Sequence, residues 1–157
     1  MTKIADQFIE GCAEIRAALV AFPAASADKP YRPGGWTRKQ ILGHMVDSAA
    51  NNHQRFVRGA LEGHYSGPGY QQDGWVEIHG YAELPWDTLL ELWAAAHGML
   101  ERVVARIPEE RFGAMCVVGE GAPVTLQFLI EDYVVHQRHH LTQILTKSET
   151  QAAVSEK

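Results

Sequence analysis

YVVHQRHHLTQI, residues 133–144, is the segment that decides both the fold and the site of this chain. His136 and His140 lie about 40° apart on a helical wheel and one turn apart along the axis, so both imidazoles can reach one metal ion. His139 lies roughly 60° to the other side of His136, and we interpret it as a surface or rim residue. The apolar positions that extend the arc beyond His140 are Leu129, Ile130, Tyr133, Leu141 and Ile144. The segment predicts an amphipathic helix with two metal ligands at the edge of its buried face.

Two histidines from one helix do not complete a transition-metal site, so another helix has to supply a ligand. His44 is the candidate, because it begins a polar arc on a second predicted helix. The arc continues with Ser48, Asn51 and Arg55, and Asp47 lies just outside it. The wheel alone allows an alternative in which this arc is a solvated helix face. The presence of the histidine pair favours a ligand at His44.

Further polar side chains lie one turn from the histidine pair. Asp132 precedes His136, where its carboxylate could accept the second ring N–H of that ligand and fix its tautomer. The alternative for Asp132 is an exposed helix acid. Gln143 follows His140 and offers a similar contact. The histidines without a partner at ligand spacing are interpreted as surface or hydrogen-bonded residues, and they are His53, His64, His79 and His97.

The apolar periodicity predicts four helices of about 20 residues each, and hence an all-α fold, a four-helix bundle. The predicted helices cover residues 3–22, 37–61, 85–108 and 125–147. Thr37 and Gln40 resemble a capping box at the start of the second helix. Residues 62–85 form a long, aromatic-rich connection between the second and third helices, either a pocket lid or a satellite cluster under a loop. Residues 114–124 predict a short hairpin around the glycines.

Composition and length restrict the class of protein. The chain has 157 residues, of which 46% are hydrophobic and 21% charged, as in a soluble globular domain. We expect one domain over residues 1–147 and a disordered tail over 148–157. A net charge of −5 without a dense basic cluster disfavours nucleic acid as a partner. No apolar stretch is long enough for a membrane span, and no secretory signal is found, so we expect a cytoplasmic protein.

The quoted segment, together with GGWTRKQILGHMVDSAANNHQRF at residues 34–56, resembles the DinB-like superfamily of metal-binding four-helix bundles, in particular its YfiT-like branch. The residues that match the first motif are Trp36, His44, Asp47, Ser48, Asn51 or Asn52, and Arg55. The second motif is matched by His136, His140, Gln143 and Ile144. The resemblance covers nearly all of residues 4–147. It implies a metal-dependent hydrolase or a transferase that uses a low-molecular-weight thiol, acting on a small-molecule substrate.

Three neutral histidines leave at least one coordination position of a divalent ion open, as in a catalytic zinc site. Imidazole ligands suit zinc, nickel, copper and iron alike, so the ligands do not identify the metal. Zinc or nickel is the expected ion. The candidate catalytic residues are Arg55, Asn51 and Asp47, with Arg55 and Asn51 expected to orient an anionic or polar substrate. The rival interpretations are a noncatalytic metal-binding or stress-response module, and a protein whose histidines are structural and bind no metal.

Aromatic residues suggest how the protein assembles. Phe8, Phe22, Trp86 and Trp93 supply more aromatic surface than one small core needs, which predicts a two-fold homodimer. Trp86 and Trp93 at helical spacing are also typical of core positions, and Cys12 on the apolar stripe of the first helix is typical of an inert core thiol.

Overall fold

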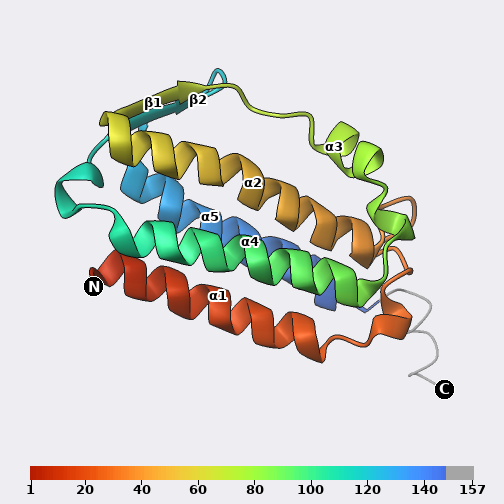
Figure 1. Ribbon diagram of the computed structural model, residues 1–157. Helices are drawn as coiled ribbons and strands as arrows, with labels where there is room; N and C mark the ends of the chain where they lie inside the picture. The colour runs from red at the N-terminus through yellow and green to blue at the C-terminus, as the bar shows by residue number, and fades with distance from the viewer. Residues whose placement is uncertain (148–157) are drawn as a thin grey trace.

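The apolar periodicity of the sequence forms four long helices in the computed structural model, which describes residues 1–147. They are α1 (Lys3–Ala21), α2 (Arg38–Glu62), α4 (Trp86–Arg106) and α5 (Leu126–Leu145). Figure 1 shows them side by side as a bundle. The expected fold class is confirmed, and the predicted helix bounds agree to within about two residues. The predicted disordered tail lies outside the described residues.

Threonine side chains fix the starts of the two helices that matter most for the site. Thr37 Oγ1 accepts a hydrogen bond from the Gln40 backbone N–H at 3.2 Å, and Gln40 Oε1 accepts one from the Thr37 N–H at 2.9 Å. This is the predicted capping box, which satisfies two backbone donors reciprocally. Thr125 Oγ1 accepts from the Phe128 N–H at 3.1 Å and caps α5 in the same way.

The helices form a ring in the order α1, α4, α2, α5. Helix α2 packs against α4 and α5, and α1 packs against the same two helices. Helices α1 and α2 are therefore diagonally opposite each other. The interface between α2 and α5 brings together the two sequence segments from which the metal site was predicted.

The connections contain more structure than the sequence indicated. Strands β2 (Met115–Val118) and β3 (Val124–Thr125) pair antiparallel, which confirms the predicted hairpin. Strand β1 (His64–Gly67) pairs parallel with β2 and was not predicted, because its short sequence HYSG has no alternating pattern. The connection between α2 and α4 also contains α3 (Gln72–His79). Figure 1 shows the small sheet at one end of α2 and α3 at the other, with the connection running between them.

Three short 3-10 helices complete the described secondary structure of residues 1–147. They are η1 (Ala24–Ser26), η2 (Tyr81–Glu83) and η3 (Glu109–Arg111). Helix η2 follows α3 directly after Gly80, whose φ of 61° lies in the left-handed region.

The core contains the residues from which a dimer was predicted. Phe8, Trp86 and Trp93 are at most 3% exposed, and the Phe22 ring packs against Trp86 with centroids 5.2 Å apart. These aromatic side chains therefore pack inside a single chain. The expectation that they form the surface of a homodimer interface is wrong. Cys12 is also buried, and its burial raises the pKa of the thiol to about 12, which keeps it inert.

A slot on α2 holds the connection in place. A Cβ atom at Gly43 would collide with the ring of Tyr81, so the ring lies directly against the helix backbone. From this position the Tyr81 hydroxyl donates a hydrogen bond of 2.6 Å to Asp47 Oδ1, one turn further along α2. Glycine at position 43 thus allows η2 to pack against the bundle.

The buried histidine His97 has both ring nitrogens in hydrogen bonds. Its Nδ1–H donates to the Trp93 carbonyl at 2.8 Å, which leaves Nε2 to accept from the Tyr133 hydroxyl at 2.7 Å. The ring also stacks on the Trp93 ring, with centroids 3.8 Å apart. Burial is the largest influence on the His97 pKa and lowers it from 6.5 to about 4.

We predict that Gly43→Ala lowers the free energy of unfolding by about 1–3 kcal/mol, because the added methyl overpacks the Tyr81 slot. The control is Gly98→Ala on α4, where a Cβ meets no atom within 4 Å. That change should raise stability by up to about 1 kcal/mol through helix propensity. Denaturant unfolding measures both, and a stabilised Gly43→Ala variant would contradict the slot.

We predict that acid destabilises the fold through His97. Between pH 6.5 and about 4 the unfolded chain binds a proton at this ring that the folded chain does not, so the free energy of unfolding falls as the pH falls through this window. His97→Gln should make this pH dependence shallower. Unfolding curves at several pH values measure the slope, and NMR titration of the ring should show it neutral until about pH 4.

Candidate functional site

A cavity of about 220 Å³ lies between α2, α5 and the connection. Helix α2 contributes His44, Ser48, Asn52 and Arg55 to its wall. Helix α5 contributes Asp132, His136 and His140 among others, and the connection contributes Tyr70 and Gln72. The three histidines predicted as ligands thus line one cavity.

His44 and His140 face each other across the interface between α2 and α5. Their Nε2 atoms are 3.2 Å apart, and the two rings are nearly perpendicular. The Nδ1–H of His140 donates to Gln143 Oε1 at 2.9 Å, which leaves His140 Nε2 with a lone pair directed at His44. Gln143 therefore makes the contact that the sequence suggested for it.

The environment keeps both rings neutral. The pKa of His44 is lowered to about 4, mainly by burial and in addition by the neighbouring His140 and His136. Burial also lowers the pKa of His140, although the hydrogen bond to Gln143 opposes this. Neutral imidazole is the form that binds a metal, so both rings are ready to act as ligands at neutral pH.

The distance between the two nitrogens fits a shared metal ion. Two imidazoles on one tetrahedral zinc, each with a Zn–N bond of about 2.0–2.1 Å, hold their nitrogens about 3.3–3.4 Å apart. His44 Nε2 and His140 Nε2 are 3.2 Å apart. His44 Nδ1 is buried and makes no hydrogen bond within the described chain. The pair therefore has the separation of two ligands of one ion.

His136 lies less close to this pair. Its side chain is 62% exposed, and its Nδ1 contacts the Asp132 carboxylate at 3.2 Å and the Asp132 carbonyl at 3.1 Å. This is the contact predicted for Asp132, and it leaves Nε2 as the nitrogen open to a ligand role. Within residues 1–147 no three His, Cys, Asp or Glu side chains lie close enough together to hold a metal ion. The structure thus brings two of the three predicted ligands together and places the third on the same cavity.

Aromatic rings cover the His44 side of the cavity. The centroid of the His44 ring lies 5.1 Å from that of Trp36 and 6.4 Å from that of Tyr70, and Tyr70 in turn packs on Trp75. Because Tyr70 belongs to the connection and lines the cavity, the aromatic run forms part of the pocket wall. Tyr81 is buried in the core and Tyr65 packs against it, so only part of the aromatic run lines the cavity.

Two of the candidate catalytic residues lie off the cavity. Asn51 donates its amide N–H to the Asp47 carbonyl at 2.9 Å, and its neighbour Asn52 lines the cavity instead. The wheel of a single helix does not show which partners face the arc, so it could not distinguish the two asparagines. Arg55 does line the cavity, as expected.

Asp47 holds the connection against α2. Its buried Oδ1 accepts hydrogen bonds from the Tyr81 hydroxyl at 2.6 Å and from His79 Nδ1 at 3.1 Å. Burial raises the pKa of Asp47, and the contacts with Tyr81 and His79 oppose the shift. No local pattern indicates this cluster, because its members come from α2 and from a connection more than thirty residues later.

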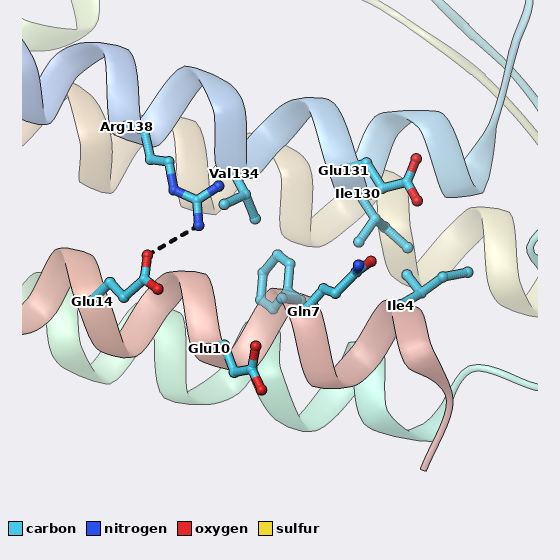
Figure 2. A pocket seen from close by; sticks show the side chains of 9 residues that line it. Ile4, Gln7, Glu10, Glu14, Ile130, Glu131, Val134 and Arg138 are labelled. Atoms are coloured by element: carbon cyan, nitrogen blue, oxygen red, sulfur yellow. Dashed lines mark hydrogen bonds and ion pairs between the residues drawn. The ribbon is translucent and has the colours of Figure 1, made fainter.

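A second hollow of about 280 Å³ lies between α1 and α5 (Figure 2). Its floor is apolar, with Phe8 and Ile130 among its residues, and its rim bears Glu10, Glu14 and Arg138. Arg138 pairs with Glu14 at 3.1 Å, and both side chains are at least half exposed. The hollow contains none of the predicted ligands and has no buried polar residue on its wall, so it is not the candidate site.

The remaining histidines agree with their interpretation as surface or hydrogen-bonded residues. His97 and His79 are hydrogen-bonded, His64 is exposed, and His53 is partly exposed. His139 is exposed on α5, as its place on the wheel predicts. Among the described residues, no helix is long and apolar enough to cross a membrane.

The fold and the facing histidines define a four-helix-bundle protein with a histidine-lined cavity, and sequence comparison identifies the family. The DinB superfamily profile matches residues 7–144, and the chain belongs to this family. A protein of Bacillus cereus named "Putative metal-dependent hydrolase" is 28% identical over 131 residues, which cover 83% of this chain and 75% of the relative. A protein of Geobacillus thermodenitrificans with the same name is 26% identical, covering 84% and 75% of the two chains.

Solved structures show the same fold. YfiT from Bacillus subtilis, described as a probable metal-dependent hydrolase with an unusual four-helix bundle topology, superposes with a TM-score of 0.80 at 25% identity, covering 92% of this chain and 86% of YfiT. A mycothiol-dependent maleylpyruvate isomerase superposes with a TM-score of 0.76 at 13% identity, covering 93% of this chain and 61% of the isomerase.

We predict that His44→Ala, His136→Ala and His140→Ala each lose bound divalent metal, because each removes one imidazole from the cavity. His139→Ala is the matched control: it removes an exposed neighbour on the same helix and should keep the metal. Metal content after dialysis against zinc or nickel, measured by mass spectrometry, gives the stoichiometry. Full stoichiometry in one variant would remove that residue from the site, and full stoichiometry in all three would overturn the site.

Proposed function

We propose that this protein is a metal-dependent hydrolase that acts on a small molecule in the cavity between α2 and α5. His44, His136 and His140 hold one divalent ion, zinc or nickel. The observation that carries the proposal is the 3.2 Å separation of His44 Nε2 and His140 Nε2 at the wall of a cavity large enough for a substrate. The family and the names of its hydrolase relatives support the same reaction class.

The chain's own residues prepare the cavity for such a reaction. Gln143 orients His140 through Nδ1, and Asp132 orients His136 in the same way. A divalent ion bound by three histidines would act as a Lewis acid with an open position and would lower the pKa of a water molecule or thiol. Trp36 and Tyr70 cover the His44 ring and limit the access of bulk water from that side.

Transfer involving a low-molecular-weight thiol is the second candidate. It is favoured by the structural neighbour that is a mycothiol-dependent isomerase, which shares the fold at low identity. A divalent ion deprotonates a coordinating thiol, so the same three histidines would serve either reaction. A noncatalytic metal-binding or stress-response module is the alternative outside enzymes, and only turnover separates it from the first two.

A homodimer in the cytoplasm remains part of the proposal. Its interface has to lie elsewhere than at the aromatic residues first considered, since those pack inside one chain. Phe128 and Val135 lie two turns apart on α5 and are 49% and 59% exposed, which makes them the better candidates for such an interface.

We predict metal-dependent turnover from a panel of activated esters and amides, and of electrophiles supplied with small thiols. Activity should disappear on chelation and return when zinc or nickel is added back. His44→Ala should be inactive with either metal, while His139→Ala should match the unmodified protein.

The different substrates of this panel distinguish the three proposed functions. Turnover of esters or amides without a thiol supports the hydrolase, whereas turnover that requires a thiol supports the transferase and overturns the hydrolase. Metal binding without turnover in any arm favours the noncatalytic module.

A further inference from the structure

We propose that the substrate bears a carboxylate, and that Arg55 binds it at the end of the cavity away from His44. The inference deepens the proposed function, on which it rests for the identity of the cavity as a substrate site. It concerns a separate binding event, which can be measured whether or not a metal is present.

Arg55 is a buried charge without a counter-charge among the described residues. The residue is only 9% exposed and lines the cavity. Within residues 1–147 no carboxylate lies at ion-pair distance from it, and its one hydrogen bond, to Asn52 Oδ1, is long at 3.4 Å. Taking a guanidinium out of water is costly unless it is paired. A ligand anion in the cavity would supply the missing partner.

The other polar side chains on this wall are paired with one another. Ser48 lies one turn before Asn52 on the same helix, and Tyr70 reaches the wall from the connection. The Asn52 amide N–H is already donated to the Ser48 carbonyl at 2.8 Å, and its Oδ1 faces Arg55. The side chains of Ser48 and Tyr70 are hydrogen-bonded to each other, so the Arg55 N–H groups that do not face Asn52 are the donors that remain for a ligand oxyanion.

The acidic residue on the opposite wall does not neutralise Arg55. Asp132 belongs to α5, and its Oδ2 contacts His136 Nδ1 at 3.2 Å. The carboxylate therefore has a partner at the histidine end of the cavity. Of the Lys and Arg residues within 1–147, only Arg55 lines this cavity.

The charge and size of the cavity select the class of anion. One guanidinium binds one carboxylate in a bidentate manner, and it balances a single negative charge better than the double charge of a phosphate. A volume of about 220 Å³ is below the roughly 300–1,000 Å³ typical of pockets for drug-sized ligands, so the ligand is a small molecule. His44 and Arg55 are eleven residues apart, or about 16 Å along the helix axis, of which the arginine side chain spans a part. The carboxylate is therefore separated from the reacting group by several bonds.

The test compares two probes of nearly the same shape, butyrate and its neutral isostere butyramide, with the full-length protein. Binding is followed by NMR chemical shifts, in chelated and in zinc-loaded protein. We expect butyrate to bind more tightly than butyramide, and Arg55→Gln to weaken butyrate by about 10- to 100-fold, as for a charged hydrogen bond. Arg55→Gln should still bind metal, because Arg55 is not a ligand.

Arg58→Gln is the matched control, since Arg58 lies on the same helix but is exposed and contacts only Gln54. It should bind butyrate like the unmodified protein. Equal binding of the two probes, or unchanged butyrate binding in Arg55→Gln, overturns the inference. Tighter binding of inorganic phosphate than of butyrate overturns the choice of carboxylate. If Arg55→Gln does not fold, the comparison of the two probes on the unmodified protein decides.

Failure of the proposed function gives a different result. In that case zinc does not bind or no substrate is turned over, yet chelated protein still distinguishes butyrate from butyramide. Failure of the present inference leaves metal binding and turnover intact and removes only the preference for the anion.

Discussion

The buried guanidinium of Arg38 is the interaction on which the arrangement of α2 and α5 depends. It donates hydrogen bonds to the Ile144 carbonyl at 3.1 Å, to the Pro30 carbonyl at 2.6 Å, and also to Thr146 O. The last carbonyls of a helix have no hydrogen-bond partners within the helix and carry partial negative charge. A cationic donor there supplies the missing hydrogen bonds and balances the charge. The start of α2 is thereby fastened to the end of α5. This sets the two helices antiparallel and aligned.

The histidine pair follows from this alignment. With Arg38 at the end of α5, position 44 of α2 lies opposite position 140 of α5, and the Nε2 atoms meet. A second contact supports the same alignment: Gln137 donates to the Met45 carbonyl at 3.3 Å and accepts from the Trp93 indole at 3.1 Å. The site is therefore built on helices, and three buried side-chain atoms of the described residues lack a hydrogen bond: His44 Nδ1, Asp47 Oδ2 and Trp86 Nε1.

Much of this architecture could be predicted from the sequence, because it is encoded locally. The spacing of apolar residues predicted the four helices, and the Thr37 capping box predicted the start of α2. The spacing of His136 and His140 predicted that both lie on one face of a helix. The rest depends on contacts between distant segments. Strand β1 exists only through its pairing with β2, Asp47 is occupied by Tyr81, and the choice of Asn52 over Asn51 depends on which elements face α2. The 62% exposure of the His136 side chain is likewise not visible in the periodicity of the helix.

One wall of the cavity is formed by helices and the other by a connecting segment. The histidines lie on helices whose backbones are locked by their own hydrogen bonds, whereas Tyr70 and Gln72 lie on a connection joined to α2 through the Tyr81 slot and the Asp47 cluster. Loops accept insertions and substitutions that helices do not. Evolution can therefore reshape the selectivity of the cavity by changing the connection while the metal ligands stay in place.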